Sequence, residues 1–438
     1  VNGGTLNLEE GSVGANGQVE VGGQATLNLE GDLTVAGMLK VGGQATLNLE
    51  ADLTVAGILN LHPHSFFNLE GNTLNAAGAR LELGGERSFD SITTNENTTL
   101  QVNSYLDLSR TDSGSSTIGN LELIMLEGDS GSNSLNISDM NLVVGGVAAL
   151  DGKNITQSNG NLEFQDTPTL SNSSSLSVES GELIFQSGAS ISDSSLDFTS
   201  SIFKPSGTVS LVSSSDFIFD SDSSVILEGD TTISDDMGSF SWPSLDLNGN
   251  TLTLASNVTD MSVDGAMSIG TGESLNSGTS DLSLSSTLTI DNGGILSSDS
   301  GQVQIGGALT LDGDLVQGGG ILNLISGGSV GTTGELDVKD SELKLGDELS
   351  FAGTLVVNSG TTWSGLGGTV DLSTGTLESA GGTFNLDAFT IGANSTFRLS
   401  GDTEISSAND LTLGNLELGG NKLSLDFASV NNATLILP

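Results

Sequence analysis

The chain has 438 residues, of which 15% are charged and only 4% are aromatic. Its 55 acidic residues against 10 basic ones give a formal net charge of -45. This argues against nucleic acid as a partner, because duplex binding depends on Lys and Arg displacing the counterions around the phosphates. With 35% hydrophobic residues and 61 glycines, we expect a folded chain with a small-residue core and glycine-rich turns.

The sequence contains no cysteine, which excludes a disulfide framework and a thiolate metal site. No apolar run approaches the roughly 18 residues that span a bilayer, so we expect no membrane insertion. The lack of cysteine and the scarcity of lysine favour a secreted, cell-surface location. The sequence opens at Val1 without a signal-like segment, and we expect a mature chain or an excerpt of a longer one.

A repeat dominates the beginning of the chain. The segment 21–39 reads VGGQATLNLEGDLTVAGML, and 41–59 is an almost unchanged copy displaced by 20 residues. Leu6-Asn7-Leu8-Glu9 precedes the first copy of its own phrase by 21 residues, and Asn68-Leu69-Glu70 follows the second by 20. At least four successive units therefore share one template, the sequence signature of a repeat architecture.

Within each unit, apolar and polar residues alternate, as in Thr26-Leu27-Asn28-Leu29-Glu30, which is typical of a half-buried strand. Glycine-containing pairs separate these short runs and indicate tight turns. A unit of this size cannot bury its own apolar side, so units must stack with equivalent strands about 4.8 Å apart. The sequence predicts an all-β fold, a parallel β-helix (β-solenoid) with 20–21 residues per turn and roughly 21 turns.

The repeat persists in weaker form further along the chain. Leu162 and Phe164 recur 21 residues later as Leu183 and Phe185, and phenylalanines recur at Phe198, Phe219 and Phe240, which predicts a stack of rings in successive turns. We expect one continuous solenoid over 1–438, with the most regular repeats in 1–85 and degenerate repeats in 86–438.

Two later segments follow the pattern Leu-x-Leu-x-Gly-Asn-x-Leu-x-Leu in full or in part, at 245–254 and 416–425. Together with the 20-residue unit, they resemble the repeats of bacterial surface β-helices, namely filamentous-haemagglutinin-type adhesins and autotransporter passenger domains. The resemblance implies export, right-handed coiling and a role as a stalk, adhesin or filament. It carries over no functional residue, because no catalytic or binding motif of that family is present.

Two local patterns could carry chemistry. His62 and His64 are the only histidines, and a His-x-His pair can ligate a metal. The intervening Pro63 interrupts strand pairing, so we expect an exposed corner instead. Asp235-Asp236 is the only adjacent Asp pair and is expected to form an ordinary turn. We therefore predict no catalytic, cofactor-binding or metal-binding residues, and at most diffuse binding of calcium by the acidic surface.

Other polar and aromatic signals are weak. Trp242, Trp363 and Tyr105 are isolated, and we expect them to fill corners of the solenoid. The segments 110–116 and 133–139 are expected to be irregular loops that could bind a ligand. Sequons for N-glycosylation occur at Asn97, Asn136, Asn154, Asn172, Asn257, Asn394 and Asn432.

These observations predict a non-enzymatic extracellular structural protein. Neither end shows an obvious cap, so copies are expected to stack end to end, or the chain to continue into further solenoid, forming a cell-surface filament or stalk. The first alternative is an adhesin passenger that binds a surface, host or glycan ligand. The second is a β-helix polysaccharide lyase or hydrolase, which would need paired carboxylates and a cation close to its acidic substrate.

Overall fold

The chain divides into two compact units, Val1–Ser224 and Val225–Pro438, in the computed structural model. Each unit is described by itself. The residues that the structure describes are 2–62, 65–75, 80–93, 99–109, 115–118, 120–124, 134–138, 141–144, 148–212, 215–235, 239–358, 360–365, 369–372, 374–385, 389–391, 394–406, 411–412, 415–426 and 435–436. The prediction of one continuous solenoid over 1–438 stays a prediction.

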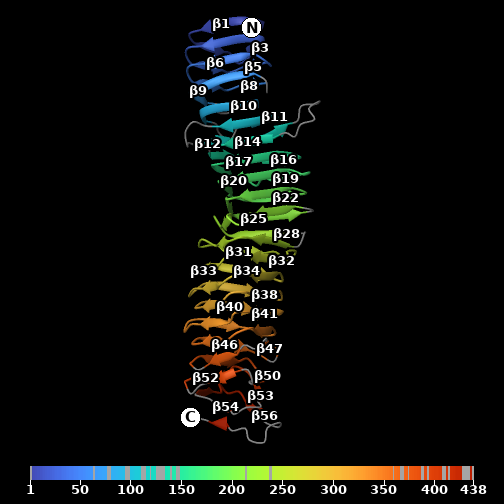
Figure 1. Ribbon diagram of the computed structural model, residues 1–438, viewed down its shortest axis with the longest axis vertical. Coiled ribbons are helices and arrows are strands. Elements are labelled where there is room, and N and C mark those ends of the chain that lie inside the picture. Colours follow the sequence, from blue (N-terminus) through green and yellow to red (C-terminus); the bar gives the residue numbers. More distant parts are fainter. Residues whose placement is uncertain are drawn as a thin grey trace. The chain divides into compact units, whose positions relative to one another are not determined.

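Parallel ladders of short strands build the first unit (Figure 1). The longest ladder contains β3 (Gln18–Leu29), β5 (Met38–Val41), β8 (Ile58–Leu61), β10 (Arg80–Thr93), β11 (Thr99–Ser109), β13 (Asn120–Ile124), β16 (Ala148–Asp151), β19 (Thr169–Ser171), β22 (Gly188–Ser192) and β25 (Gly207–Val212). At the beginning of the chain, two more ladders contain β1 (Asn2–Leu8), β2 (Gly11–Val13), β4 (Leu33–Val35), β6 (Thr46–Leu49), β7 (Leu53–Val55) and β9 (Phe66–Asn75).

Two further ladders complete the first unit. One continues from β11 through β14 (Ser134–Ser138), β17 (Asn154–Ser158), β20 (Ser175–Glu179), β23 (Ser195–Thr199) and β26 (Asp216–Phe219). The other contains β12 (Ser115–Ile118), β15 (Asn141–Val144), β18 (Asn161–Phe164), β21 (Glu182–Phe185) and β24 (Ile202–Pro205).

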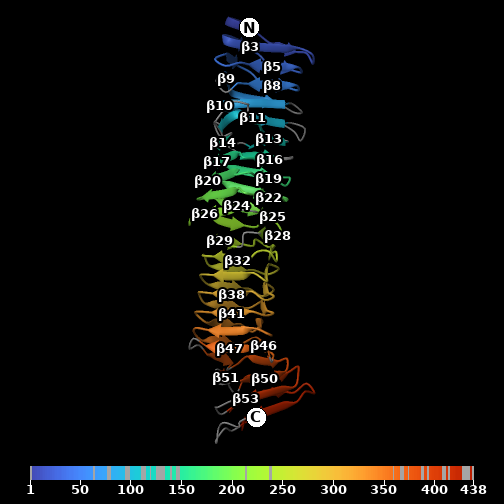
Figure 2. The same cartoon turned by 90° about the vertical axis from the view of Figure 1, so that its right-hand side faces the viewer.

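The second unit follows the same plan (Figure 2). Its longest ladder contains β28 (Thr231–Asp235), β31 (Thr251–Leu254), β34 (Ser274–Gly278), β37 (Ile295–Ser298), β40 (Asp314–Gln317), β43 (Glu335–Asp337), β46 (Thr354–Val357), β49 (Thr376–Ser379), β52 (Thr396–Leu399) and β55 (Asn415–Glu417). A second contains β29 (Ser239–Trp242), β32 (Asp260–Val263), β35 (Asp281–Leu284), β38 (Gln302–Ile305), β41 (Ile321–Leu324), β44 (Glu342–Leu345) and β47 (Thr362–Gly365).

The third ladder of the second unit contains β33 (Met267–Ile269), β36 (Leu288–Ile290), β39 (Leu309–Leu311), β42 (Gly328–Val330), β45 (Leu349–Phe351), β48 (Val370–Leu372) and β51 (Phe389–Ile391). Shorter pairings join β27 (Ser224–Ile226) to β30 (Leu245–Asp246), β50 (Gly382–Asn385) to β53 (Thr403–Ser406) and β56 (Leu423–Asp426), and β54 (Leu411–Thr412) to β57 (Leu435–Ile436).

The described residues form only strands and connecting turns, and the strand pairs are parallel. The predicted all-β parallel β-solenoid with about 21 residues per turn is therefore confirmed. The longest ladder takes one strand from each turn, so the described turns are slightly fewer than the roughly 21 expected from the length. The right-handed coiling implied by the resemblance stays a prediction.

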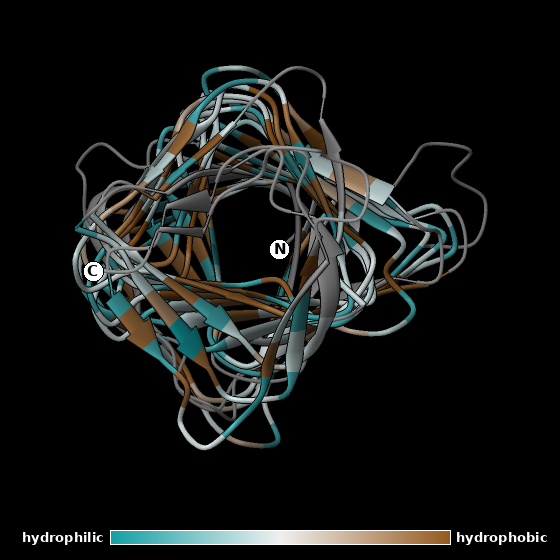
Figure 3. Ribbon diagram, turned by 90° about the horizontal axis from the view of Figure 1, so that it is seen from below, coloured by the Kyte–Doolittle hydropathy of each residue, from teal (hydrophilic) through white to brown (hydrophobic). Residues whose placement is uncertain are grey.

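The repeat in the sequence sets the register between turns. Thr26 lies opposite Thr46 and Leu27 opposite Leu47, one template length apart. Leu27 and Leu47 are both buried, while the polar residues between such leucines face outward. Within each unit the apolar side chains therefore form columns around a narrow interior (Figure 3), and burying each leucine contributes about 1.5–3 kcal/mol.

Close approach of adjacent turns explains one glycine of the template. Gly37 and Gly57 occupy the same corner in two successive copies, and a Cβ on Gly57 would collide with the carbonyl oxygen of Gly37. The neighbouring amide of Ala56 donates a hydrogen bond of 2.8 Å or less to the turn above, at Val35 O (2.7 Å). A side chain at this corner would push the two turns apart and break the ladder.

Candidate functional site

The face of β1 is the part of the first unit where apolar side chains are left uncovered. Leu6 and Leu8 are 39% and 38% exposed, although they lie opposite Leu27 and Leu29, which are 3% and 1% exposed. Both pairs occupy the inward column, but only one side of β1 has a partner strand among the described residues. The face thus presents two leucines beside the unpaired backbone groups of an edge strand.

A column of asparagines runs along the outside of the same strands. The side-chain Nδ2 of Asn48 donates to Oδ1 of Asn28 at 2.8 Å, and Nδ2 of Asn28 donates to Oδ1 of Asn7 at 2.7 Å. Every amide in this column points its donor toward the preceding turn. The Nδ2 group of Asn7 therefore faces outward at the β1 edge, where a further strand would need an acceptor.

Positive charges in both units are held in ion pairs with nearby carboxylates. Lys40 pairs with Glu20 at 3.4 Å and Lys204 with Glu182 at 3.1 Å, in each case between adjacent turns. Arg398 bridges Glu378 (3.4 Å) and Glu417 (2.9 Å), one turn away on either side. Because these cations are engaged, the excess carboxylates dominate the charge that each unit presents to solvent.

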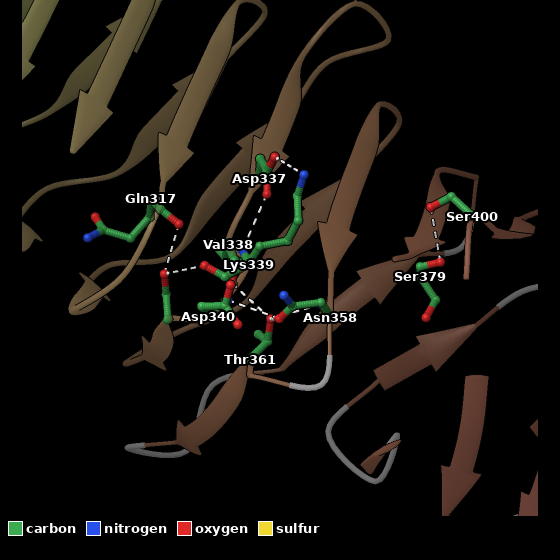
Figure 4. A network of polar contacts seen from close by, with 10 residues as sticks. Gln317, Asp337, Val338, Lys339, Asp340, Asn358, Thr361, Ser379 and Ser400 are labelled. Carbon is green, nitrogen blue, oxygen red and sulfur yellow. Dashed lines mark hydrogen bonds and ion pairs between the residues drawn. The ribbon is translucent and has the colours of Figure 1, made fainter. Parts of the chain in front are cut away.

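A group of carboxylates gathers on the outer face of β40, β43 and β49 in the second unit. Burial raises the pKa of the Glu335 carboxyl, the charges of Asp314, Asp337 and Glu378 raise it further, and Lys339 opposes them. Lys339 itself pairs with Asp337 at 2.8 Å (Figure 4). The hydrogen bond to Asp337 raises the pKa of Lys339, so the ammonium stays charged and partly neutralises the group.

Below this group, a polar corner joins successive turns. Thr361 donates to the carbonyl oxygen of Val338 at 2.8 Å, and Asp340 N donates to the side chain of Asn358 at 3.0 Å (Figure 4). Ser341 donates to the carbonyl oxygen of Gln317 at 2.8 Å. Buried hydroxyls at this corner thus satisfy backbone carbonyls, and the arrangement is structural.

A shallow depression of about 280 Å³ lies on the first unit, at the corner before β17, β20, β23 and β26. Its lining residues carry hydroxyl, amide and carboxylate groups. They are Asn154, Ser173, Ser174, Ser175, Asp193, Ser194, Ser195 and Asp216.

Asp197 lies one turn before Ile218 on the outer face next to this depression. Burial raises the pKa of the Asp197 carboxyl, a hydrogen bond from Ser195 lowers it, and the charge of Asp216 raises it. The depression can accept hydrogen bonds from a polyhydroxylated ligand, and its carboxylates disfavour an anionic one.

The sequence candidates for chemistry are not brought together into a site. His62 is exposed at a turn where Ser65 donates to its carbonyl oxygen at 2.7 Å, while Pro63 and His64 lie outside the described residues. Asp235 ends β28 and Asp236 lies outside the described residues. Among the described residues, no three His, Cys, Asp or Glu side chains are arranged to hold a metal ion.

Trp242 bears out the expectation for the isolated aromatics. It is fully buried, and its ring lies 5.3 Å from that of Phe240. Tyr105 lies in β11 and Trp363 in β47, but their side chains are not among those described.

The expectation of an irregular loop at 133–139 is wrong. Ser134–Ser138 forms β14, in register with Asn154–Ser158 of β17. Its alternation, Leu135 and Ile137 inward with Asn136 between them, is a strand pattern that the flanking serines obscured. At 110–116, Ser115 and Ser116 begin β12 and lie in a strand, whereas residues 110–114 lie outside the described part of the chain.

The described sequons lie on turns or outward strand positions. Asn136, Asn172, Asn257 and Asn394 are exposed and Asn154 is half-buried, while Asn97 and Asn432 lie outside the described residues. The sequence pattern missed both the depression and the exposed leucines of β1. The recurrence of serine one turn apart (Ser174 and Ser194) could have indicated the depression, because equivalent residues of successive turns line one face.

No helix among the described residues has the length and apolar character needed to cross a bilayer. Fold and surface together define a parallel β-solenoid repeat protein. Comparison with known proteins adds no relative: no family model, no curated protein and no solved structure matches this chain.

Proposed function

We propose that this chain is a non-enzymatic extracellular structural protein, a β-solenoid that stacks end to end with further copies, or continues into a longer chain, to form a cell-surface filament or stalk. The observation that carries the proposal is the exposure of Leu6 and Leu8 on β1, at positions that are buried in the following turns.

The chemistry of the β1 face favours another solenoid turn as its occupant. Covering Leu6 and Leu8 removes apolar surface from water, and a parallel strand satisfies the edge amides and carbonyls. The free donor of Asn7 calls for an outward-facing acceptor at the matching position. Ser424 holds such a position in β56, between Leu423 and Leu425, which lie opposite the inward Thr403 and Ile405.

Contact between unlike faces of identical chains is heterologous, and such contacts form open filaments when they do not close into a ring. The acidic surface opposes this contact, because both participating segments carry carboxylates, including Glu9 and Glu10 beside β1 and Asp426 at the end of β56. Salt or cations should therefore promote assembly by screening the repulsion.

A variant with two lysines on the β1 face tests the proposal. Leu6→Lys with Leu8→Lys places two charges on the apolar face, whereas Ser12→Lys places one on an exposed outward position of β2, in the same turn. Sedimentation velocity should show large assemblies for the parent chain and the Ser12→Lys control, but single chains for the double variant. Equal assembly of all three proteins would refute the proposed interface, and circular dichroism checks that each variant folds.

The depression on the first unit favours a second candidate function, an adhesin that binds a neutral glycan. Its hydroxyls, the Asn154 amide and the carboxylates of Asp193 and Asp216 offer many hydrogen-bonding groups to a polyol. NMR titration with neutral oligosaccharides should shift Ser195 and Asp216. Asp193→Ala should weaken this effect and Asp166→Ala, at an exposed turn outside the depression, should not. Absence of shifts with every neutral oligosaccharide would remove the adhesin alternative at this site.

A polysaccharide lyase or hydrolase has weaker support. Such an enzyme needs a cation beside its carboxylates to hold an acidic sugar, and the described cations Lys204, Lys339 and Arg398 are engaged in ion pairs. We therefore place the enzyme below both binding roles.

A further inference from the structure

The turn between β36 and β37 contains an Asn-Gly pair whose reacting groups are unrestrained. Gly294 N donates to Asp291 O at 2.8 Å, closing a turn with Asn292 and Gly293 at its centre. Gly293 has φ +84°, a conformation that favours glycine. Both central residues are exposed, and no described group forms a hydrogen bond with the Asn292 side chain or with the Gly293 amide.

An asparagine followed by glycine can react with its own backbone. The amide nitrogen of the glycine attacks the side-chain carbon of the asparagine, because glycine has no Cβ to hinder the approach. The pair occurs five times in this chain, at Asn2, Asn16, Asn159, Asn248 and Asn292. The local sequence is the same in each case, so the folded structure must decide which asparagine reacts first.

Hydrogen bonds hold the attacking nitrogen at two of the other pairs. Gly17 N donates to Gly14 O at 2.7 Å, and Gly249 N donates to Oε1 of Glu273 at 2.6 Å. The amide of Asn248 is held as well, since its Nδ2 donates to Leu227 O at 3.0 Å. Both pairs must break these bonds before the ring can close.

The pair at Asn159 is intermediate. Asn159 N donates to Glu179 O at 3.0 Å, and Gly160 is half-buried against the next turn, where Gly181 passes over it. The Asn2 side chain lies outside the described residues. Asn292 is therefore the least restrained of the described side chains in these pairs.

We propose that Asn292 is a site of spontaneous modification to aspartate and isoaspartate. Gly293 N forms a bond to Cγ of Asn292 and loses its proton, while the Cγ–Nδ2 bond breaks and the nitrogen leaves as ammonia. Water then adds to one of the two carbonyl carbons of the resulting succinimide and opens the ring. Opening at one carbon gives aspartate, and opening at the other gives isoaspartate.

Thr271 in the preceding turn controls the rate of this reaction. Its Oγ1 donates to the carbonyl oxygen of Asn292 at 2.8 Å and so holds the peptide group that joins Asn292 to Gly293. That peptide group must rotate before Gly293 N can reach Cγ. Thr271 therefore acts as a positioning residue that slows the modification.

Either product changes the corner between β36 and β37. A carboxylate adds one negative charge to a chain that already carries -45. Isoaspartate also lengthens the backbone of the turn by one carbon atom, which displaces Gly294 N from Asp291 O. The modification would thus mark the age of a long-lived structural protein at one defined corner.

Peptide mapping by mass spectrometry, with separation of aspartate from isoaspartate, tests the proposal on the full chain kept folded in mildly alkaline buffer. Asn292 should be converted several-fold faster than Asn16 or Asn248, and Thr271→Val should accelerate Asn292 several-fold while leaving Asn16 unchanged. In concentrated urea the ranking should disappear, because the restraints are lost.

Faster conversion of Asn16 or Asn248 in the folded chain would overturn the proposal. An unchanged or slower rate at Asn292 in Thr271→Val would overturn the role of Thr271, and persistence of the ranking in urea would refute the structural explanation. Asn292→Gln should abolish the signal at this corner, and hydrogen exchange at the amides of β36 and β37 checks that both variants retain the native turn.

Discussion

The ring of Phe198 lies parallel to that of Phe219 in the next turn, with centroids 4.5 Å apart and an interplanar angle of 8°. Phe203 adds a third ring, 5.3 Å from Phe198. Both Phe198 and Phe203 are buried, so this stack replaces the leucine columns as the core of the first unit at these turns.

Truncating this stack should destabilise the first unit strongly. We expect Phe198→Ala to lower the free energy of unfolding by about 3–5 kcal/mol, because it leaves a cavity beside two rings. Ile218→Ala is the matched control, since Ile218 is 52% exposed and surface changes usually stay within about 0.5 kcal/mol. Urea unfolding followed by fluorescence and circular dichroism gives both values, and equal effects would contradict the assigned packing.

The carboxylate of Glu273 joins two turns of the second unit. Its Oε1 accepts from Gly249 N and its Oε2 from Gly270 N, each at 2.6 Å. We expect Glu273→Ala to lower the free energy of unfolding by about 1–3 kcal/mol, the range for hydrogen bonds to charged groups. Glu348→Ala, at an exposed turn position, should have little effect. Hydrogen exchange should also speed up at Gly249 and Gly270 in Glu273→Ala alone.

Protonation of Glu335 should stabilise the second unit. Burial and the charges of Asp314, Asp337 and Glu378 raise its folded pKa above the ordinary value of 4.5. As the pH falls through the folded pKa, the folded chain binds the proton first, so the free energy of unfolding rises until the pH reaches the unfolded value. Glu335→Gln should be more stable than the parent at neutral pH and should lose this dependence. A fall in stability at neutral pH would contradict the assignment.

Asp220 should show the opposite pH dependence in the first unit. Hydrogen bonds from the Ser223 hydroxyl (2.6 Å) and Ser200 N (3.1 Å) lower its pKa below 3.8. Its contribution is therefore present above the unfolded value and is lost as the pH falls through the folded pKa. Asp220→Asn should be less stable than the parent at neutral pH and equal to it in strong acid, as measured by thermal unfolding at several pH values. A difference that persists in strong acid would contradict this role.

The strict part of the repeat predicted the fold down to its register. The phrase Thr26-Leu27-Asn28-Leu29 and its copy lie opposite each other residue by residue, because the strand period and the turn length both recur unchanged. Phe164 and Phe185 likewise face each other as their spacing predicted, with ring centroids 5.8 Å apart. Of the expected phenylalanine stack, Phe198 and Phe219 are confirmed, whereas Phe240 lies in the second unit and contacts Trp242.

Elsewhere the sequence could not supply the structure. Tyr105 lies opposite Ser134, a displacement far from the repeat length, because an insertion shifts the strand that follows it. Side-chain bonds to the backbone of the next turn, such as those to Glu273, depend on corner geometry and leave no periodic signal. The uncovered leucines of β1 read in the sequence like their buried equivalents, since exposure is set by what stacks above a turn.

Salt should control assembly if the β1 face is the interface. The Debye length falls from about 10 Å at 0.1 M to about 3 Å at 1 M ionic strength, which screens repulsion between acidic faces. We expect the average assembly size from light scattering to rise with sodium chloride for the parent chain. The Leu6→Lys, Leu8→Lys double variant should lose this increase, and a decrease with salt for the parent would show that charge attraction drives assembly.

Electron microscopy of the purified chain, over a range of protein and salt concentrations, tests the central claim most directly. The account predicts unbranched fibres whose axial repeat is one chain, formed in high salt and abolished by lysines at Leu6 and Leu8. Single particles under every condition, at concentrations where the chain remains folded, would contradict end-to-end stacking between copies.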